Sequence, residues 1–584
     1  MTESKSTHKP NADGVRTLPA SVSLPESLIR IAERVSARGC RLFAVGGLVR
    51  NTLLGLPVSD IDICSALSPD ETIELAHEMG FKVVPKGIAF GMVEIHAEGE
   101  KFEHTTFRAD KYSDGGAHRP TSIQFSKTPE EDSRRRDFSV NALYCDILTR
   151  EILDPSGGLP DLENRVLRTS SIDPEIVLAD DGLRILRLVR FAAELQFKID
   201  PATFACASRL CGNLRDISAE RIRDELNKLL LCDIKYGSRN TEQVLNGLLL
   251  LRDIGALAVI LPELSRGRGI AQKPTHHRYD VLDHALHTAA ESKPMLVPRL
   301  AGLLHDVAKP VVLEKNGNMH GHDAEGEIIS REIMQRLRYD NKTTDEVCFI
   351  VRHHMYDLNN TAKDKTLRRT FARWGVERSL EIADIRDADV HGSGIIAGEV
   401  ESAARWRILL QKMQQEGVPF SARALNCSGA DIMNWLSLPA SPAVGKIKAA
   451  LLAHCAVYPA DNTPARLKKL DSSMNDYHQK LCELVISYIN EHYTDNTLCL
   501  NDIAASANVS PAYLSALFKK NQGISLSDFI TSQRISAAAR YLTTTTMSLK
   551  EISLKCGYAN QYYFSTSFKK KMGITPSAYR EQHT

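Results

Sequence analysis

The sequence predicts a multidomain α+β protein, in which one small mixed sheet is followed by several helical domains. Three observations support this prediction. The 584 residues are too many for one hydrophobic core. Short apolar runs alternate with helical stretches from about residue 26 to 147, whereas the rest of the chain has helical periodicity. Near the C-terminus YLSALFKKNQGIS (513–525) recurs as YFSTSFKKKMGIT (563–575), which indicates a duplicated helical unit.

Composition restricts the classes of function. The net charge is +1 and 43% of the residues are hydrophobic, so any nucleic-acid-binding surface must be local. No segment approaches the ~20 apolar residues of a membrane span. The N-terminal MTESKSTHKPNADG has no signal-peptide apolar stretch. Twelve cysteines without a C-x-x-C pair indicate buried thiols in a reducing cytosol. We therefore expect a cytoplasmic protein with no membrane partner.

Changes in pattern along the chain divide it into six parts. They are a disordered leader (1–24), a head that contains the sheet (25–150), a helical neck or body (151–265), a histidine-rich all-helical domain (266–400), a helical tail or linker (401–475) and an all-helical C-terminal domain (476–584).

The segment LFAVGGLVRNTLLGLPVSDIDIC (42–64) places flexible backbone next to paired negative charge. On a strand, Asp60 and Asp62 lie on one face, where they repel each other unless a cation lies between them. Mg²⁺ prefers such oxygen ligands and leaves room for substrate phosphates. Gly46 and Gly47 let backbone N–H groups approach a triphosphate. The pattern favours metal-assisted nucleotidyl transfer over the alternative, a surface turn with two solvated aspartates.

Residues 40–230 resemble the class II tRNA nucleotidyltransferases (CCA-adding enzymes) and the related bacterial poly(A) polymerases. The first motif of that family is GG-x-x-R followed by D-x-D, and it corresponds here to Gly46, Gly47, Arg50, Asp60 and Asp62. In this chain Asn51 replaces the aspartate that usually follows the arginine of this motif. FEHTTFRADKYSDGGAHRP looks like the family's second strand and flexible loop, and RRRDFSVNALYCD matches R-R-D-x-x-x-N-A. The resemblance implies three catalytic carboxylates with Mg²⁺ at the first two: Asp60, Asp62 and Glu103. It implies nucleotide binding by Gly46, Gly47, Arg50, Arg108, Arg135, Arg136, Asp137 and Asn141.

DDGLRILRLVRF (180–191) resembles the family's nucleobase-reading element, normally E-D-x-x-R, with Asp180 in place of the glutamate. On one helix, Asp181 and Arg184 would share a face. The resemblance implies that this pair reads the edge of cytosine or adenine in place of a template strand. Arg187 and Arg190 continue the face and are expected to hold phosphates. The alternative is an amphipathic helix with an ordinary ion pair.

The resemblance implies that the 3′ end of tRNA is the primer and that CTP and ATP are the substrates. CCA addition and poly(A) addition use the same chemistry, so the catalytic residues do not separate them. VVPKGIAFGMVEIHAEG resembles the CCA-adding form and not the basic, aromatic signature of poly(A) polymerases. We therefore expect CCA addition, with poly(A), CC-only and A-only addition as open alternatives.

Residues 276–389 are rich in histidine and aspartate, which are mixed ligands for transition metals. The pair His305-Asp306, with His284 upstream, resembles the HD phosphohydrolase superfamily. This resemblance implies a divalent-metal site with the ligands His284, His305, Asp306, His322, His354 and Asp389. His320 and His353 compete for the later positions. Hydrolysis of a 2′,3′-cyclic or other phosphate ester is the implied activity, and a folded but inactive domain is the alternative. Lys309 could contact a phosphate or simply face solvent.

Residues 480–584 resemble the AraC/XylS DNA-binding domains, which have two helix-turn-helix units joined by a long helix. That helix is expected over LSDFITSQRISAAARYLTT (526–544), and GITPSAYR fits the end of that family. Recognition helices are expected to begin near residues 510 and 560. Expected DNA contacts are Ser510, Tyr513, Lys519, Lys520, Asn560, Tyr563, Lys569, Lys570 and Lys571. A protein-docking helical bundle is the alternative.

Two hypotheses for the whole chain follow. In the first, the protein is a tRNA nucleotidyltransferase with an HD domain and an appended DNA-binding module. In the second, it is a transcription regulator that uses its front half to sense nucleotide or RNA. The complete set Asp60, Asp62, Asp181 and Arg184 favours the enzyme, because a sensor does not need paired catalytic carboxylates. The sequence gives no indication of the oligomeric state.

Overall fold

The computed structural model describes residues 16–19, 24–58, 60–111, 122–238, 240–395, 397–436, 440, 442–507 and 509–583. They belong to two compact units. The first comprises Met1–Ala362 and Glu377–Leu409, and the second comprises Lys363–Val376 and Leu410–Thr584. Most of the expected leader (1–15 and 20–23) and the expected flexible loop (112–121) lie outside the described residues.

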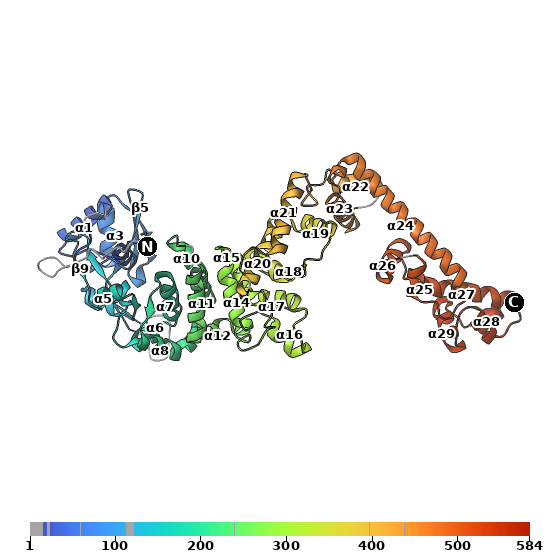
Figure 1. Ribbon diagram of the computed structural model, residues 1–584, viewed down its shortest axis with the longest axis horizontal. Coiled ribbons are helices and arrows are strands. Elements are labelled where there is room, and N and C mark those ends of the chain that lie inside the picture. Colours follow the sequence, from blue (N-terminus) through green and yellow to red (C-terminus); the bar gives the residue numbers. More distant parts are fainter. Residues whose placement is uncertain are drawn as a thin grey trace. The chain divides into compact units, whose positions relative to one another are not determined.

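The first unit contains a mixed seven-stranded sheet in the order β3-β4-β5-β2-β1-β8-β9. Strands β5 and β9 of this sheet are labelled in Figure 1. Within the sheet, β2 and β5 pair in parallel and the other neighbours pair antiparallel. This confirms the expected small mixed sheet. The strands are β1 (Phe43–Val45), β2 (Ile61–Ser65), β3 (Lys82–Gly87), β4 (Met92–Ala97), β5 (Glu100–Thr106), β8 (Tyr144–Asp146) and β9 (Ile152–Leu153). Two further pairs stand apart: β6 (Arg108–Lys111) with β7 (Ser122–Phe125), and β10 (Val166–Leu167) with β11 (Lys198–Ile199).

Helices α1 (Glu26–Ala37) and α3 (Pro69–Glu78) pack against this sheet. In α1, Leu28, Ile31 and Val35 recur at helical spacing and are all buried, so the helix has one apolar face. Ser68 begins α3 with a capping box to Glu71. The head also contains α2 (Gly47–Leu54) and α4 (Pro129–Arg134).

Residues 16–19 differ from the expectation of a disordered leader. Leu18 is buried in the core of the head, and its N–H donates to the carbonyl of Arg150 at 2.9 Å. An isolated bridge also joins Thr17 to Glu151, next to β9. The buried Leu18 side chain and these backbone contacts attach this short segment to the head.

The rest of the first unit is helical. The neck contains α5 (Gly158–Asn164), α6 (Pro174–Asp180), α7 (Leu183–Leu195), α8 (Pro201–Leu210), α9 (Ala219–Leu230), α10 (Cys232–Lys235), α11 (Thr241–Ile254), α12 (Ala256–Ile260) and α13 (Pro262–Ser265). Then follow α14 (Val281–Glu291), α15 (Leu296–Leu304), α16 (Lys309–Asn316), α17 (His322–Arg336), α18 (Asn341–His353), α20 (Val376–Gly392) and α21 (Glu401–Gln415). The boundary with the second unit falls within α21, after Leu409.

Two close contacts hold these helices together. A side chain at Gly247 of α11 would come within 2.5 Å of Leu229 on α9, so the two helices need glycine there to approach. A buried ion pair joins Asp233 of α10 to Arg299 of α15, with Nη1–Oδ1 at 2.5 Å and Nη2–Oδ2 at 2.6 Å. The neck is thereby attached to the histidine-rich helices.

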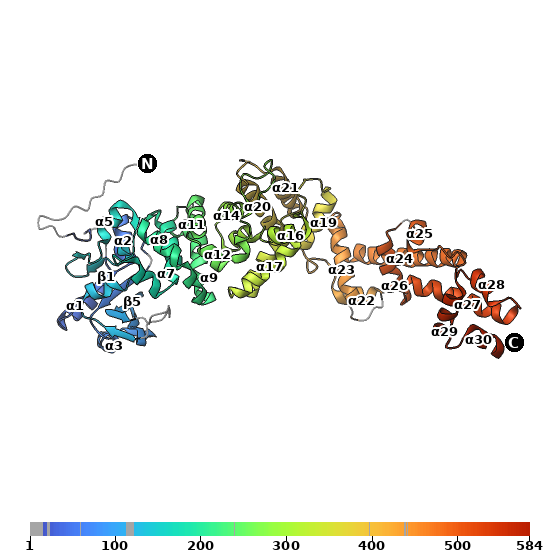
Figure 2. The same ribbon diagram turned by 90° about the horizontal axis from the view of Figure 1, so that it is seen from below.

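The second unit is entirely helical among its described residues. Its helices are α19 (Asp364–Trp374), α22 (Gly429–Leu436), α23 (Pro442–Cys455), α24 (Pro464–His492), α25 (Leu500–Ser506), α26 (Pro511–Gln522), α27 (Leu526–Thr544), α28 (Leu549–Lys555), α29 (Gln561–Met572) and α30 (Pro576–His583). The long α24 contacts α22 and α23 near its start and α25 and α26 near its end (Figure 2). It passes without a break through residue 476, where the sequence analysis places a domain boundary.

The repeat at the C-terminus is a structural repeat. Leu514 and Phe518 are buried in one hydrophobic cluster, and Phe564 and Phe568, fifty positions later, are buried in a second cluster. The long helix α27 joins the two helix-turn-helix repeats, as expected. No helix in the described part of the chain has both the length and the apolar character needed to span a bilayer.

Candidate functional sites

Three carboxylates meet where β2 begins. Asp60 directly precedes β2, Asp62 lies within it, and the parallel register places Glu103 of β5 opposite Asp62. Burial raises the pKa of Asp62, and the charges of Glu103 and Asp60 raise it further. A bound cation would relieve this repulsion, and the all-oxygen donor set suits Mg²⁺.

The glycine pair lies beside these carboxylates. Gly46 follows β1 with φ 69°, a backbone conformation that strongly favours glycine. A Cβ atom at this position would lie 3.6 Å from Oδ2 of Asp62. Gly47 is the first residue of α2, so the N-terminus of this helix is next to the carboxylates.

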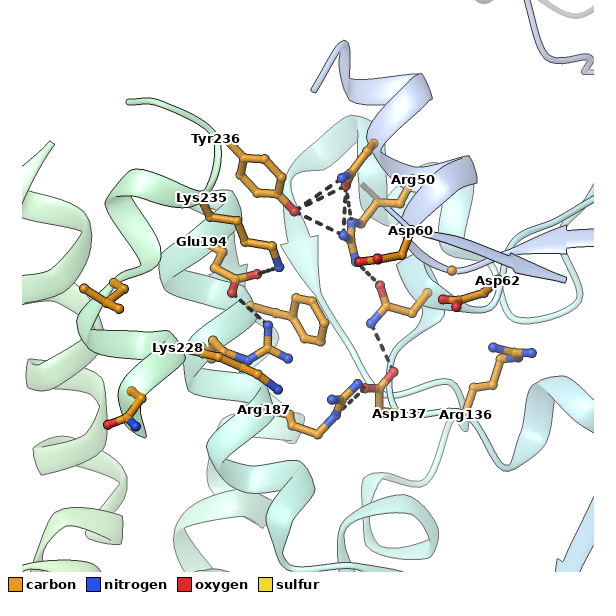
Figure 3. Close-up of a pocket in the computed structure, with 18 of the residues that line it drawn as sticks. Arg50, Asp60, Asp62, Arg136, Asp137, Arg187, Glu194, Lys228, Lys235 and Tyr236 are labelled. Atoms are coloured by element: carbon orange, nitrogen blue, oxygen red, sulfur yellow. Dashed lines mark hydrogen bonds and ion pairs between the residues drawn. The ribbon is translucent and has the colours of Figure 1, made fainter. Parts of the chain in front are cut away.

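A cavity of about 670 Å³ contains most of the expected nucleotide-binding residues (Figure 3). Head and neck both line it. The expected residues that line it are Gly46, Gly47, Arg50, Asp60, Asp62, Arg136, Asp137, Asn141, Arg187 and Arg190. Five others are not among its lining residues: Glu103, Arg108, Arg135, Asp181 and Arg184.

A continuous polar chain crosses this cavity from head to neck. The Arg50 guanidinium donates to the side-chain oxygen of Asn141, whose amide donates to Asp137 at 3.0 Å. Arg187 of α7 donates to the other oxygen of Asp137 at 2.6 Å. Burial by itself would raise the pKa of Asp137, but the Arg187 charge lowers it to about 2. Asp137 is therefore a buried carboxylate that stays ionised.

Asp132, to which no sequence motif pointed, orients the two arginines of the R-R-D motif. Its buried carboxylate accepts from Arg135 at 2.7 Å, from Arg136 at 2.9 Å and from the Tyr144 hydroxyl at 2.8 Å. Burial alone would raise the pKa of Asp132, but the charges of the arginines lower it to about 2. The spacing of Asp132 from Arg135 and Arg136 could have predicted these ion pairs, because residues three and four apart on a helix are neighbours.

The neck supplies residues that no motif pointed to: Phe191, Glu194, Lys228, Lys235 and Tyr236 all line the cavity. Arg190 is buried and donates to Glu194 at 2.8 Å and to Glu225 at 2.6 Å. Its charge is thus compensated by two carboxylates of the neck.

Asp181 and Arg184 do not share a helical face, so that expectation is wrong. The helix breaks between α6 and α7: Asp181 is extended and its Oδ1 accepts from the N–H of Leu183 at 3.0 Å. Gly182 lies in the break, where a Cβ atom would come within 3.0 Å of the Asn213 backbone. Arg184 instead donates to the carbonyls of Val177 and Arg135, both at 2.7 Å.

The remaining head residues have local partners. Arg108 begins β6, and its guanidinium donates to the carbonyl of Phe90 at 2.6 Å. Arg221 of α9 donates to Asp181 at 2.6 Å, which ties the neck to the segment between α6 and α7.

The six expected HD ligands converge in one cluster, in which five are buried and Asp389 is partly exposed. Two groups could each hold a metal ion: His284 with His305 and Asp306, and Asp306 with His322 and His354. Asp306 is shared, with Oδ2 at 3.2 Å from Nε2 of His305 and Oδ1 at 3.2 Å from Nε2 of His322. Oδ1 of Asp389 lies 2.9 Å from Nε2 of His284.

Backbone carbonyls fix three of these imidazoles. Nδ1 of His305, His322 and His354 lies 2.7–2.8 Å from a carbonyl oxygen three residues earlier. A proton on Nδ1 leaves Nε2 as a lone-pair donor toward the cluster, which is the tautomer that a metal requires. The competing candidates differ: His320 is exposed, and among the described residues His353 belongs to neither of the two ligand groups.

Two positively charged groups, His305 and Lys309, lie beside the Asp306 carboxylate. Burial by itself would lower the pKa of His305, but Asp306 raises it to about 10. Lys309 lies 2.5 Å from Oδ2 of Asp306 and also donates to Gln272 at 2.8 Å. The nitrogen and oxygen donor set fits divalent transition metals.

The second unit presents two candidate DNA-facing helices, α26 and α29. Ser510 precedes α26, and the Asn560 side chain caps α29 by accepting from the N–H of Tyr562 at 2.7 Å. Tyr562 is 82% exposed and Tyr563 is 66% exposed, far more than aromatic residues in a helical core. Lys519, Lys520, Lys569, Lys570 and Lys571 are exposed as well. The side chain of Tyr513 lies outside the described residues.

Four protein-family patterns match successive parts of the chain. The poly A polymerase head domain matches residues 42–168, and the probable RNA and SrmB-binding site of polymerase A matches residues 196–267. The HD domain matches residues 276–391, and a helix-turn-helix domain matches residues 503–582.

Relatives were found for the front of the chain. A CCA-adding enzyme of Streptococcus suis is 38% identical over 209 residues, which is 36% of this chain and about half, 50%, of that enzyme's length. A multifunctional CCA protein of Chromobacterium violaceum is 34% identical over 369 residues, 60% of this chain and 84% of that protein. The crystal structure of the Bacillus stearothermophilus CCA-adding enzyme with CTP has a TM-score of 0.57 at 25% identity, covering 78% of this chain and 98% of that one.

Proposed function

Because the chain belongs to the CCA-adding tRNA nucleotidyltransferase and poly(A) polymerase family, we propose that it adds CCA to the 3′ end of tRNA from CTP and ATP. The observation that supports this best is that Asp60 and Asp62 line one cavity together with glycines and arginines, and that Glu103 pairs with Asp62 across β2 and β5. An anionic substrate and a cation can share this place, which is what nucleotidyl transfer requires.

Asp60, Asp62 and Glu103 would hold Mg²⁺. Bound Mg²⁺ supplies neutralisation of phosphate charge and activation of the attacking 3′ hydroxyl. Arg136 and Arg187 face the cavity and supply fixed positive charge for the triphosphate. Asp132 and Asp137 hold these arginines in place before substrate arrives.

Nucleobase selection by Asp181 and Arg184 is part of the proposal. In the structure Arg184 donates to two backbone carbonyls and Asp181 accepts from Arg221. Reading a base would therefore require these side chains to exchange partners when nucleotide binds. Such an exchange would select cytosine or adenine by hydrogen bonding and not by shape alone.

The test uses the purified full chain, tRNA that lacks its terminal CCA, and labelled CTP and ATP. Products resolved at single-nucleotide length distinguish the alternatives. Three added residues in the order CCA support the proposal. One A on tRNA ending in CC supports A-only addition, a long A tail supports a poly(A) polymerase, and no label in RNA overturns the enzymatic proposal.

A second activity is favoured by the shared carboxylate of Asp306. A carboxylate between two histidine groups can hold two divalent ions, which suits hydrolysis of a phosphate ester. We propose a metal-dependent phosphohydrolase, with Lys309 beside Asp306 as a phosphate contact. Opening of the cyclic phosphate of a 2′,3′-cyclic nucleotide by water, to give a nucleoside monophosphate, with added Mn²⁺ or Ni²⁺ would support it, as would loss of this activity in Asp306→Asn. No hydrolysis with any divalent ion would favour a folded, inactive domain.

We also propose that α26 and α29 bind DNA, supported by the duplicated helix-turn-helix units and the exposed lysines and tyrosines. Titration of the full chain against genomic fragments at several salt concentrations tests this. Binding no tighter than to random DNA would remove sequence-specific regulation. Specific binding without nucleotide incorporation would favour the hypothesis of a regulator with a nucleotide or RNA sensor.

A further inference from the structure

A row of three carboxylates crosses neighbouring strands on the face of the sheet that carries Asp62. Asp62 on β2 pairs with Glu103 on β5, and Glu103 pairs on its other side with Glu94 on β4. Paired residues point to the same face, and neighbouring strands are about 4.8 Å apart. These carboxylates are partly exposed, whereas the residues next to Glu94 and Glu103 along their strands are buried. Glu94 is therefore one strand spacing from Glu103 and two from Asp62, on the open face of the sheet.

Glu94 differs from the other two carboxylates because both of its oxygens have a basic partner. Oε2 pairs with the ammonium of Lys86, and Oε1 lies 2.5 Å from Nε2 of His96. Lys86 comes from β3, at the irregularity in the β3–β4 register between Pro85 and Gly87. These partners, Lys86 first, lower the pKa of Glu94 to about 2. Glu94 is thus an anchor for Lys86, and its charge is already compensated.

Lys86 is close enough to the expected cation site to affect it. Its hydrogen bond to Glu94 raises the pKa of Lys86, and the charge of Glu103 raises it further. The Lys86 side chain is 47% exposed, so its ammonium can move on a flexible stem. A positive charge beside a cation site repels the cation, and the same charge would block Glu103 if the two side chains paired. The place of this ammonium therefore matters for how strongly the carboxylates bind a metal.

We propose that Glu94 is a positioning residue that holds the Lys86 ammonium away from Glu103. From there the lysine weakens cation binding by the catalytic carboxylates but does not block it. The free protein then binds its cation weakly. The site fills when the metal arrives with a triphosphate, whose negative charge outweighs the positive charge of one ammonium. This inference rests on the cation site of the proposed nucleotidyl transfer, and it adds a control of metal affinity that lies outside the ligands themselves.

The direct test is equilibrium binding of Mn²⁺ to the full chain, measured from the electron paramagnetic resonance signal of free Mn²⁺. Binding that the double variant Asp60→Asn, Asp62→Asn lacks reports the head and excludes the HD cluster. Lys86→Met is expected to tighten this binding about threefold, because it removes a nearby positive charge. Glu94→Gln is expected to weaken it about threefold, because the released ammonium pairs with Glu103.

Two further variants separate the lysine from other effects. The matched control is Lys82→Met, which removes an exposed lysine of the same strand whose pairing partner is His96. It should bind Mn²⁺ as the unmodified chain does. The double variant Lys86→Met, Glu94→Gln should bind as Lys86→Met does, because Glu94 acts through the lysine. If Glu94 acted only by its own charge, the two opposite effects would cancel.

Unchanged or weaker Mn²⁺ binding in Lys86→Met overturns the proposal, and so does cancellation in the double variant. The Mg²⁺ concentration for half-maximal CMP incorporation should shift in the same directions, lower in Lys86→Met and higher in Glu94→Gln. If Mn²⁺ binding responds as expected but no nucleotide enters tRNA, the proposed function fails while this inference stands. If nucleotide enters tRNA and Mn²⁺ binding does not respond, the proposed function stands while this inference fails.

Discussion

Asp62 and Glu103 are direct partners across the parallel β2–β5 pair, although 41 residues separate them in sequence. The parallel register alone places the two carboxylates side by side. The short β1 contributes Gly46 from the opposite direction, next to Asp62. The candidate cation site is thus a consequence of strand order, with two carboxylates from the start of β2, one from β5 and a glycine that directly follows β1.

We predict that Glu103→Gln lowers the rate of nucleotide incorporation by about 100-fold and raises the Mg²⁺ concentration needed for half-maximal rate. Removing one of three oxygen ligands weakens both cation binding and phosphate neutralisation. The measurement is a Mg²⁺ titration of CMP incorporation. Glu100→Gln, on the exposed end of the same strand, is the control and should behave as the unmodified chain. An unchanged Mg²⁺ dependence in Glu103→Gln would remove Glu103 from the site.

Much of this site was predictable from sequence, because alternation along one strand determines the relation of Asp60 to Asp62. Most of the HD cluster was also predictable, because the types and the order of its histidines and aspartates left few candidates for each ligand position. The contacts of Tyr236 were not predictable, since its partner Asn51 lies 185 positions away on another domain. No local pattern reports such a contact, which depends on how the neck packs on the head.

The wrong prediction at Asp181 and Arg184 has a local cause. Helical periodicity extends across residues 174–195, but Gly182 packs against the Asn213 backbone and Asp181 caps the next helix. Periodicity describes apolar burial and does not detect a break at which both flanking helices keep their buried faces. The opposite error occurs at α24. Its polar middle predicts a boundary between two domains, but the helix continues through it.

We predict that His104 makes the head less stable as the pH falls from 6.5 toward 4. Burial lowers the pKa of His104 to about 4, from 6.5 when unfolded, so the unfolded chain binds the extra proton in this range. Stability from this group is therefore complete above pH 6.5, and roughly 2 kcal/mol of it is lost by pH 5.

The measurement is the free energy of unfolding of the head in the full chain at pH 7.5 and 5.0, followed by hydrogen exchange of the sheet. His104→Asn should reduce the difference between the two pH values, and His77→Asn, at an exposed position, should not. An identical pH dependence in the unmodified chain and His104→Asn would contradict this assignment.

We predict that the HD cluster binds two divalent ions that depend on one carboxylate. His354→Asn should lose about one ion per chain, whereas Asp306→Asn should lose both, since Asp306 belongs to both ligand groups. Metal content after dialysis, measured by mass spectrometry, checks this. His353→Asn is the matched control, because His353 is the neighbouring histidine and belongs to neither ligand group. Equal loss in His354→Asn and Asp306→Asn would exclude two separate sites.

We predict that Lys569 and Lys570 of α29 contact DNA phosphates. Replacing both by alanine should weaken binding to every DNA sequence and reduce the slope of log K against log salt by up to about 2. Fluorescence anisotropy at several salt concentrations gives this slope. Lys550→Ala, on the exposed face of α28, is the control. An unchanged slope in the double variant would place the DNA contact elsewhere.

The most direct measurement compares labelled CMP incorporation into tRNA that lacks CCA by the unmodified chain and by the double variant Asp60→Asn, Asp62→Asn. We expect rapid incorporation by the unmodified chain. For the double variant we expect a rate at least about 1,000-fold lower, because the amides cannot hold the cation at the start of β2. Incorporation at equal rates by both proteins would contradict this expectation.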